Sequence, residues 1–198
     1  MSARRDTMNC CLFDVASVLK GGFEMGNIWY NEPKTLDVAF DVIGDIVLSA
    51  ASQQYGGFTV PEVDKILEPY AEKSYQRDID KYVRLGIDRE TAESEAYADV
   101  VREFEQGFQG WEYKFNTVAS SRGDYPFITV TAGIGTGRFA KLATISLLNV
   151  RRRGQGKKEC KKPVLFPKIV FLYDENLHGP GKPLEDVFEA GVKCSAKT

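Results

Sequence analysis

The chain has 198 residues, enough for one domain with a sizeable hydrophobic core. Hydrophobic residues make up 43% and charged residues 27%, and the formal net charge of -2 argues against a nucleic-acid-binding protein. No stretch approaches the roughly 18 consecutive apolar residues that a membrane span needs, and the first residues lack the apolar segment of a signal peptide. The cysteines fit neither a disulfide scaffold nor paired C-x-x-C zinc motifs; they are Cys10, Cys11, Cys160 and Cys194. These features predict a cytoplasmic protein with reduced thiols.

The first part of the chain predicts a strand and then a helix. Residues 8–14 are apolar and end in an acid, which is typical of a buried strand, and a pair of glycines interrupts the chain after it. A helix is expected over 35–54, with Thr35 as N-cap and apolar residues at three- and four-residue intervals, namely Leu36, Phe40, Ile43, Val47 and Ala50. Gly44 in its middle predicts close packing against another backbone, since glycine there costs about 1 kcal/mol relative to alanine.

The middle of the chain predicts two long helices. A tyrosine and two glycines break the preceding helix, and the next is expected to begin with Thr59 as N-cap and Glu62 as its capping-box partner. The stretch from 61 to 115 is charged and helical in pattern. A turn inside this stretch, and a cap for the helix after the turn, are indicated by Gly86 and by Asp88 or Thr91.

The last third alternates strands and helices. A β-branched and aromatic run predicts a strand over 126–132, and Pro167 indicates a bulge or an edge position in a later strand. The remaining elements are expected as a glycine loop over 133–137, a helix over 139–150, a basic connection over 151–162, a strand over 164–173 and a helix over 184–197. This order predicts an α/β fold in which helices pack around a sheet or barrel.

Cys10 and Cys11 are neighbours, so on a strand their side chains face opposite ways. One thiol could therefore point into a barrel while the other packs outside it. Free cysteines are often small buried hydrophobic residues, and this is the simpler interpretation of both. A redox role would need a second thiol brought close by the fold.

A glycine-rich turn, residues 133–138 (GIGTGR), follows a strand and opens a helix, an arrangement that can bind phosphate. The dinucleotide fingerprint requires glycine where Arg138 stands, and the P-loop lysine is absent. A tight turn between strand and helix is the alternative. Three glycines beside an arginine could still hold an anion.

Charged residues gather in two places. Seven cations lie within twelve residues, which is typical of a solvated loop but could also contact polyphosphate or nucleic acid; they are Arg151, Arg152, Arg153, Lys157, Lys158, Lys161 and Lys162. Asp37, Asp41 and Asp45 share one helical stripe, which predicts either an exposed face or a cation that offsets their repulsion. His178 is the only histidine and lies in a loop, so it is a weak candidate for catalysis or metal binding.

Short segments along nearly the whole chain resemble the catalytic subunit of class III, or anaerobic, ribonucleoside-triphosphate reductases. In order they are 9–14 (NCCLFD), 21–27 (GGFEMGN), 33–35 (PKT), 54–59 (QYGGFT), 116–117 (NT), 126–129 (PFIT), 133–136 (GIGT), 164–168 (VLFPK) and 194–197 (CSAK). Each segment is short, but so many in one order are not expected by chance.

The resemblance implies a ten-stranded α/β barrel of two five-stranded halves, of which this chain would supply the first, together with long helices. It also implies reduction of ribonucleoside triphosphates to 2′-deoxy forms. In this family a glycyl radical, installed by a radical-SAM activase, generates a thiyl radical on a finger-loop cysteine that abstracts the ribose 3′-hydrogen. A second cysteine on the first barrel strand assists reduction at C2′, and formate supplies electrons in many members. That second cysteine matches Cys10.

The same resemblance suggests where nucleotides bind. Helices matching 35–54 and 61–115 contribute to the homodimer interface and to the site for ATP or deoxynucleotide effectors. Contacts to the ribonucleotide substrate are expected from two loops, namely Ser120, Ser121 and Arg122 in one and Gly133, Gly135 and Thr136 in the other.

Several parts of the family pattern have no match in these residues. They are the ATP-cone, the finger loop with its radical cysteine, the glycyl radical domain and the four-cysteine zinc site. Residues 1–198 are therefore expected to be a partial catalytic barrel domain that needs the C-terminal part of the subunit and is inactive alone. The alternatives are a non-catalytic nucleotide-binding or dimerisation module and, less favoured, nucleic-acid binding through 151–162.

Overall fold

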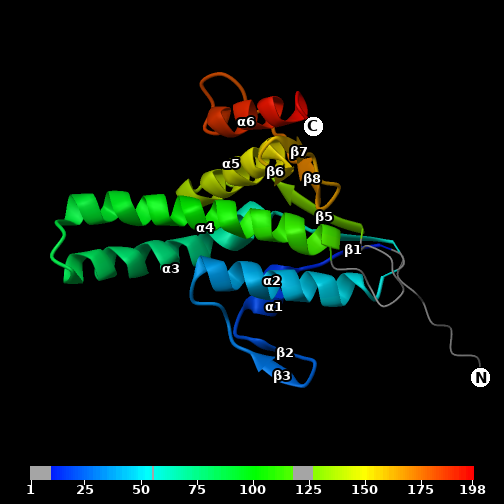
Figure 1. Ribbon diagram of the computed structural model, residues 1–198, viewed down its shortest axis with the longest axis horizontal. Coiled ribbons are helices and arrows are strands. Elements are labelled where there is room, and N and C mark those ends of the chain that lie inside the picture. Colours follow the sequence, from blue (N-terminus) through cyan, green and yellow to red (C-terminus); the bar gives the residue numbers. More distant parts are fainter. Residues whose placement is uncertain (1–9, 55, 118–126) are drawn as a thin grey trace, which may run out of the picture.

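The computed structural model describes residues 10–54, 56–117 and 127–198. Its centre is a parallel sheet whose strands lie in the order β1 (Cys11–Leu12), β4 (Gly57–Val60), β5 (Phe127–Ala132) and β8 (Lys168–Phe171). Each neighbouring pair is parallel. Parallel strands need crossover connections, and in Figure 1 helices connect each strand of the sheet to the next one along the chain. The chain is thus an α/β fold, as its element order predicted.

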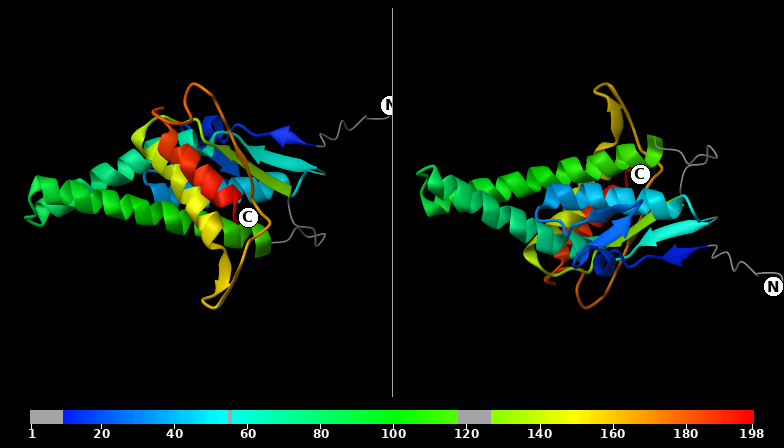
Figure 2. Two further views of the ribbon diagram at one scale, coloured as in Figure 1. Left: turned by 90° about the horizontal axis from the view of Figure 1, so that it is seen from above. Right: turned by 90° about the horizontal axis from the view of Figure 1, so that it is seen from below.

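Helices account for most of the described residues. They are α1 (Val15–Leu19), α2 (Leu36–Ala51), α3 (Val63–Arg84), α4 (Arg89–Thr117), α5 (Arg138–Arg153) and α6 (Glu185–Ser195). The views of Figure 2 show α3 and α4 side by side, extending beyond the sheet as one long pair. The predicted turn between them is confirmed, because Gly86 has φ +85° and the Asp88 carboxylate accepts a hydrogen bond from the Thr91 amide at 3.0 Å.

The two faces of the sheet differ in cover. Strand side chains alternate between faces, and those on one face are buried against the helices: Phe58, Val60, Ile128, Val130 and Ala132. On the helix side, the core continues into an aromatic cluster contributed by α2 and α4, namely Phe40, Phe104, Phe108, Trp111 and Phe115. The residues that alternate with the buried ones form the open face of the sheet.

Two antiparallel hairpins were not predicted. The first pairs β2 (Phe23–Met25) with β3 (Ile28–Tyr30), and its turn residues Gly26 and Asn27 both have positive φ. The second pairs β6 (Gln155–Lys157) with β7 (Cys160–Lys162) and projects from the body in Figure 2. It occupies most of the segment that was expected to be a basic connection.

Three local predictions are wrong. Thr59 lies inside β4 and caps nothing, and α3 instead begins after Glu62, whose φ is +48°. The strand near residue 11 is not buried, because β1 is an edge of the sheet and Leu12 is 75% exposed. Gly44 makes room for a side chain rather than a backbone, since a Cβ there would lie 3.0 Å from the Lys114 ammonium.

The other elements agree with the sequence pattern. Thr35 stands at the N-cap position of α2, although its side chain accepts no capping hydrogen bond. The amide of Leu36, the first residue of the helix, donates to the Ser74 hydroxyl. Strand β5, helices α5 and α6, and the edge position of the strand after Pro167 are confirmed. Among the helices of the described ranges, none is long and apolar enough to cross a membrane.

Candidate functional site

Cys10 lies at the end of the sheet where the parallel strands begin. It directly precedes β1, and the register of Cys11 with Phe58 places Cys10 opposite Gly57 of β4. The Gly57 amide donates a hydrogen bond to the Cys10 sulfur at 3.2 Å, and the side chain is otherwise exposed. A Cβ at Gly57 would lie 3.9 Å from the sulfur, so the glycine keeps this side of the thiol uncovered. The thiol is therefore held in one place and still accessible.

The neighbouring Cys11 has a different environment. Its side chain is half-buried and packs against the hydrophobic core. Burial, together with the adjacent Cys10, raises the pKa of the Cys11 thiol, which disfavours the reactive thiolate. The expectation that the two thiols lie in different environments is met, and Cys10 is the accessible one.

The open face of the sheet continues from Cys10 across the strands. Phe127 of β5 lies opposite Gly57 and is 55% exposed. Two residues further along the strands, on the same face, the register aligns a row that consists of Leu12, Thr59, Thr129 and Lys168. The Lys168 ammonium lies 4.8 Å from the centre of the Phe127 ring, so this face carries an aromatic ring, hydroxyls and a cation on the same side of the sheet as the thiol. Both residues lie in segments that resemble the family, 126–129 and 164–168, but neither was predicted to be a site residue.

The predicted substrate loops are not brought together with Cys10 by the described residues. Ser120, Ser121 and Arg122 lie outside those residues. The other loop, Gly133, Gly135 and Thr136, follows the last residue of β5, at the opposite end of the parallel strands. Six residues of strand separate the two ends by roughly 20 Å.

The glycine turn already holds an anion that the chain itself supplies. The buried Asp64 carboxylate accepts hydrogen bonds from the amides of Gly133 at 3.1 Å and Gly135 at 2.9 Å, and from the Thr144 hydroxyl at 3.3 Å. His178 is buried beside this turn, with its Nε2 atom 2.8 Å from the Gly133 carbonyl. Anion binding by the turn amides is thus explained by an internal carboxylate, and His178 is part of the packing.

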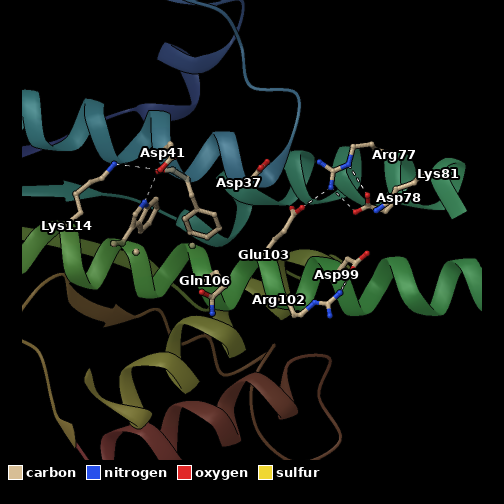
Figure 3. A pocket seen from close by; sticks show the side chains of 14 residues that line it. Asp37, Asp41, Arg77, Asp78, Lys81, Asp99, Arg102, Glu103, Gln106 and Lys114 are labelled. Atoms are coloured by element: carbon tan, nitrogen blue, oxygen red, sulfur yellow. Dashed lines mark hydrogen bonds and ion pairs between the residues drawn. The ribbon is translucent and has the colours of Figure 1, made fainter. Parts of the chain in front are cut away.

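A second candidate site is a groove of about 530 Å³ between α2, α3 and α4 (Figure 3). Its apolar residues are Phe40, Gly107, Gly110 and Trp111. Its charged and polar residues come from all three helices, namely Asp37, Asp41, Arg77, Asp78, Lys81, Asp99, Arg102, Glu103, Gln106 and Lys114. The family resemblance implies nucleotide binding by these helices but names no residue.

Ion pairs organise the charged residues of the groove. Arg77 contacts Asp78 at 2.8 Å and Glu103 at 2.9 Å, and these partners raise the pKa of its guanidinium. Lys114 lies 3.3 Å from Asp45 and 3.9 Å from Asp41, so it is the cation that offsets part of the aspartate stripe on α2.

Beside the groove, α4 makes a buried ion pair on its other side. The Arg151 side chain is only 9% exposed and donates to Glu112 at 2.8 Å and to the Pro167 carbonyl at 2.6 Å. Gln155 donates to the second oxygen of Glu112 at 2.6 Å. The expectation of a solvated loop is therefore wrong for Arg151, which lies in the last turn of α5 with its side chain inside the protein.

The parallel sheet with helical crossovers defines the class of this protein, an α/β fold. A solved structure, the anaerobic ribonucleotide reductase from Thermotoga maritima in complex with dATP and CTP, matches with a TM-score of 0.58 and 17% sequence identity. The match covers 95% of this chain and 31% of that one. It shows a shared fold.

Sequence comparisons identify the family. The family model described as anaerobic ribonucleoside-triphosphate reductase matches residues 2–198. Relatives of that name from Enterobacteria phage T4 and from Escherichia coli are 34% and 33% identical over 191 and 192 residues, 96% of this chain in each case. The chain therefore belongs to the anaerobic ribonucleoside-triphosphate reductase family. It spans 31% of the phage relative and 26% of the bacterial one.

Proposed function

We propose that this chain is the first part of the catalytic barrel of an anaerobic ribonucleoside-triphosphate reductase and that Cys10 is its reacting residue. The observation that supports this most is the placement of Cys10: an accessible thiol, held by the Gly57 amide, at the end of an open sheet face in a chain of this family. The substrate would be a ribonucleoside triphosphate, reduced at C2′ of the ribose.

The role proposed for Cys10 follows the family pattern. Its thiol would assist the reduction at C2′, for which formate would supply the two electrons, while the neighbouring Gly57 amide fixes the position of the sulfur. Phe127 would cover one side of the ribose, and the Lys168 ammonium would attract the anionic substrate to the open face. The glycyl radical, the finger-loop cysteine and formate as reductant would be supplied outside these residues, with a radical-SAM activase installing the radical.

The barrel itself is part of the proposal. Strands β1 and β8 are the two edges of the described sheet, and an open edge with exposed apolar side chains such as Leu12 and Val170 favours pairing with further strands. The family resemblance implied five barrel strands from this chain, whereas the described sheet has four, so six more strands would complete a ten-stranded barrel and enclose the face that carries Cys10. Ser120, Ser121 and Arg122 stay proposed as substrate contacts because they precede β5, whose first residue lies beside Gly57. Of the glycine turn we propose only Thr136, whose side chain is exposed, because the amides of Gly133 and Gly135 donate to Asp64.

The groove between α2, α3 and α4 is proposed to bind a deoxynucleotide effector. Its floor is closed by the edges of Phe40 and Trp111, each 3% exposed, against which a base would lie, and Lys81 and Arg102 stand at its rim where phosphates would lie. The same long helices are proposed to form the interface of a homodimer. If the groove bound a nucleotide but Cys10 took no part in catalysis, the chain would instead be a regulatory or dimerisation module.

Reconstitution tests the catalytic proposal. The chain is mixed anaerobically with a polypeptide that carries the rest of the subunit, activase, formate and CTP, and formation of dCTP is followed. Turnover is expected in the mixture, none by the chain alone, and none with Cys10→Ser. Cys160→Ser, a matched change at an exposed thiol on the projecting hairpin, should keep full turnover. Turnover by the chain alone would contradict the proposal that it is a partial domain.

Thermal denaturation tests the effector site. At a dATP concentration 100 times its dissociation constant, binding to the folded chain stabilises it by about 2.7 kcal/mol, which corresponds to a rise in Tm of about 5–10 °C. Gly110→Leu, which places a side chain in the groove, should abolish the rise. Tyr113→Ala, an exposed position on the same helix outside the groove, should not. An equal dATP response in both variants would place the nucleotide elsewhere.

A further inference from the structure

The last turns of α4 face two different parts of the molecule. Trp111 and Lys114, three residues apart, line the groove, and the Trp111 indole also donates to the Phe40 carbonyl of α2 at 2.9 Å. Glu112 and Asn116, four residues apart, point to the other side of the helix. One rigid piece of helix therefore contacts both the proposed effector groove and the segment that leads into β8.

Asn116 brackets Phe166 on that second side. Its amide nitrogen donates to the Phe166 carbonyl at 2.6 Å, and its amide oxygen accepts from the Phe166 amide at 3.0 Å. The next carbonyl, that of Pro167, is held by Arg151, which is paired with Glu112. Two consecutive residues before β8 are thus linked to α4. Asn116 holds Phe166 directly, and Glu112 holds Pro167 through Arg151.

From Phe166 the contacts lead to Cys10. The Phe166 ring is 4% exposed and meets the Phe127 ring edge to face, with 5.3 Å between centroids. Phe127 lies opposite Gly57 in the sheet, and Gly57 holds the Cys10 sulfur. A shift of the end of α4 would therefore move the aromatic ring and the strand that position the thiol.

We infer that Asn116 and Glu112 are positioning residues that couple occupancy of the α4 groove to the environment of the Cys10 thiol. This rests on the proposed function of the groove, and it names residues through which an effector would act. Aromatic rings packed edge to face and a buried ion pair resist gradual deformation, so a displacement of α4 is passed on rather than absorbed. Neither residue contacts the groove or the thiol.

Thiol reactivity measures this coupling in the intact chain. Iodoacetamide is added in the presence and absence of dATP, and peptide fragment spectra give the alkylation rates of Cys10 and of Cys160, the exposed reference thiol. We expect dATP to change the ratio of the two rates at least twofold in the wild type. In Asn116→Ala the response should be lost although dATP still binds, and in the matched control Tyr113→Ala it should persist.

The outcomes separate the two proposals. If dATP raises the Tm but leaves the ratio unchanged in the wild type, or if Asn116→Ala responds like the wild type, the coupling is overturned while the effector site stands. If dATP does not bind, the proposed effector site is wrong. The ratio of Cys10 to Cys160 alkylation rates without nucleotide then tests whether α4 is coupled to the thiol. Asn116→Ala must shift that ratio at least twofold from the wild type, and an unchanged ratio overturns the inference. If Asn116→Ala does not fold, the milder variant Asn116→Ser takes its place, and the same twofold criterion on the alkylation ratio applies to it and to the wild-type response to dATP.

Discussion

Gly107 and Gly110 of α4 offer a matched test of how this helix packs. Both are interior positions of the same helix, but a Cβ at Gly107 would lie 2.3 Å from the Phe40 ring, whereas a Cβ at Gly110 would have no neighbour within 4 Å. The Phe40 ring has little room to move, because it packs edge to face against Phe104, Phe108 and Trp111. The same substitution should therefore have opposite effects at the two positions.

The magnitudes follow from propensity and packing. Replacing glycine by alanine inside a helix stabilises it by about 1 kcal/mol, and Gly110→Ala should gain most of that. Gly107→Ala gains the same amount but forces an overpacked core, which costs about 1–3 kcal/mol. The free energies of unfolding of the two variants should then differ by about 2 kcal/mol, or about 4–8 °C in Tm for a chain of this size.

Urea denaturation of both variants beside the wild type measures these differences. We expect Gly110→Ala above the wild type and Gly107→Ala at or below it, with unchanged m-values. If Gly107→Ala were as stable as Gly110→Ala, the close approach of α4 to Phe40, and with it the shape of the groove, would be refuted.

Further predictions concern buried and titrating groups. Arg151→Met should lower the free energy of unfolding by about 3–5 kcal/mol, because it leaves Glu112 buried without its cationic partner. The double variant Arg151→Met, Glu112→Gln should recover part of this loss. A loss below about 1 kcal/mol in urea denaturation of Arg151→Met would argue against the buried pair. Burial raises the pKa of Tyr70 to about 12, above the value near 10 of an unfolded chain, so its contribution to stability is complete below pH 10 and lost as the pH rises through 12. Stability curves at pH 9 to 12 for the wild type and Tyr70→Phe should diverge in that window and not below it. The raised pKa of Cys11 predicts slower alkylation than at Cys10 at pH 8, and equal rates would contradict the assigned environments.

Local patterns predicted the elements whose signals are contained within them. The β-branched run of β5, the glycine turn and cap at Gly86 and Asp88, and the amphipathic helices α5 and α6 needed no distant partner. Strand β4 was missed because Gly57–Val60 is short, follows glycines and overlaps a capping-box pattern. Pairing with β1 and β5, residues distant in sequence, decides its conformation. The hairpin at Gly26 and Asn27 did carry a signal, since this dipeptide suits a turn with two positive φ values.

In the candidate site, too, features that depend on residues distant in sequence could not be predicted. Spacing alone left Cys10 open between a packing and a redox role, and the family resemblance selected the redox role. The anion at the glycine turn could not have been predicted, because Asp64 lies 69 residues before Gly133 and carries no motif. Likewise, the burial of Arg151 depends on Glu112, 39 residues away on another helix, whereas a run of cations in sequence is typical of a solvated loop.

The most direct test of the central claim is the rate of dCTP formation in the reconstituted anaerobic mixture with Cys10→Ser in place of the wild-type chain. We predict that this rate falls to the background of the mixture without the chain, while Cys160→Ser retains the wild-type rate. A Cys10→Ser chain that supported dCTP formation at the wild-type rate would contradict the assignment of Cys10 as the reacting thiol of this domain.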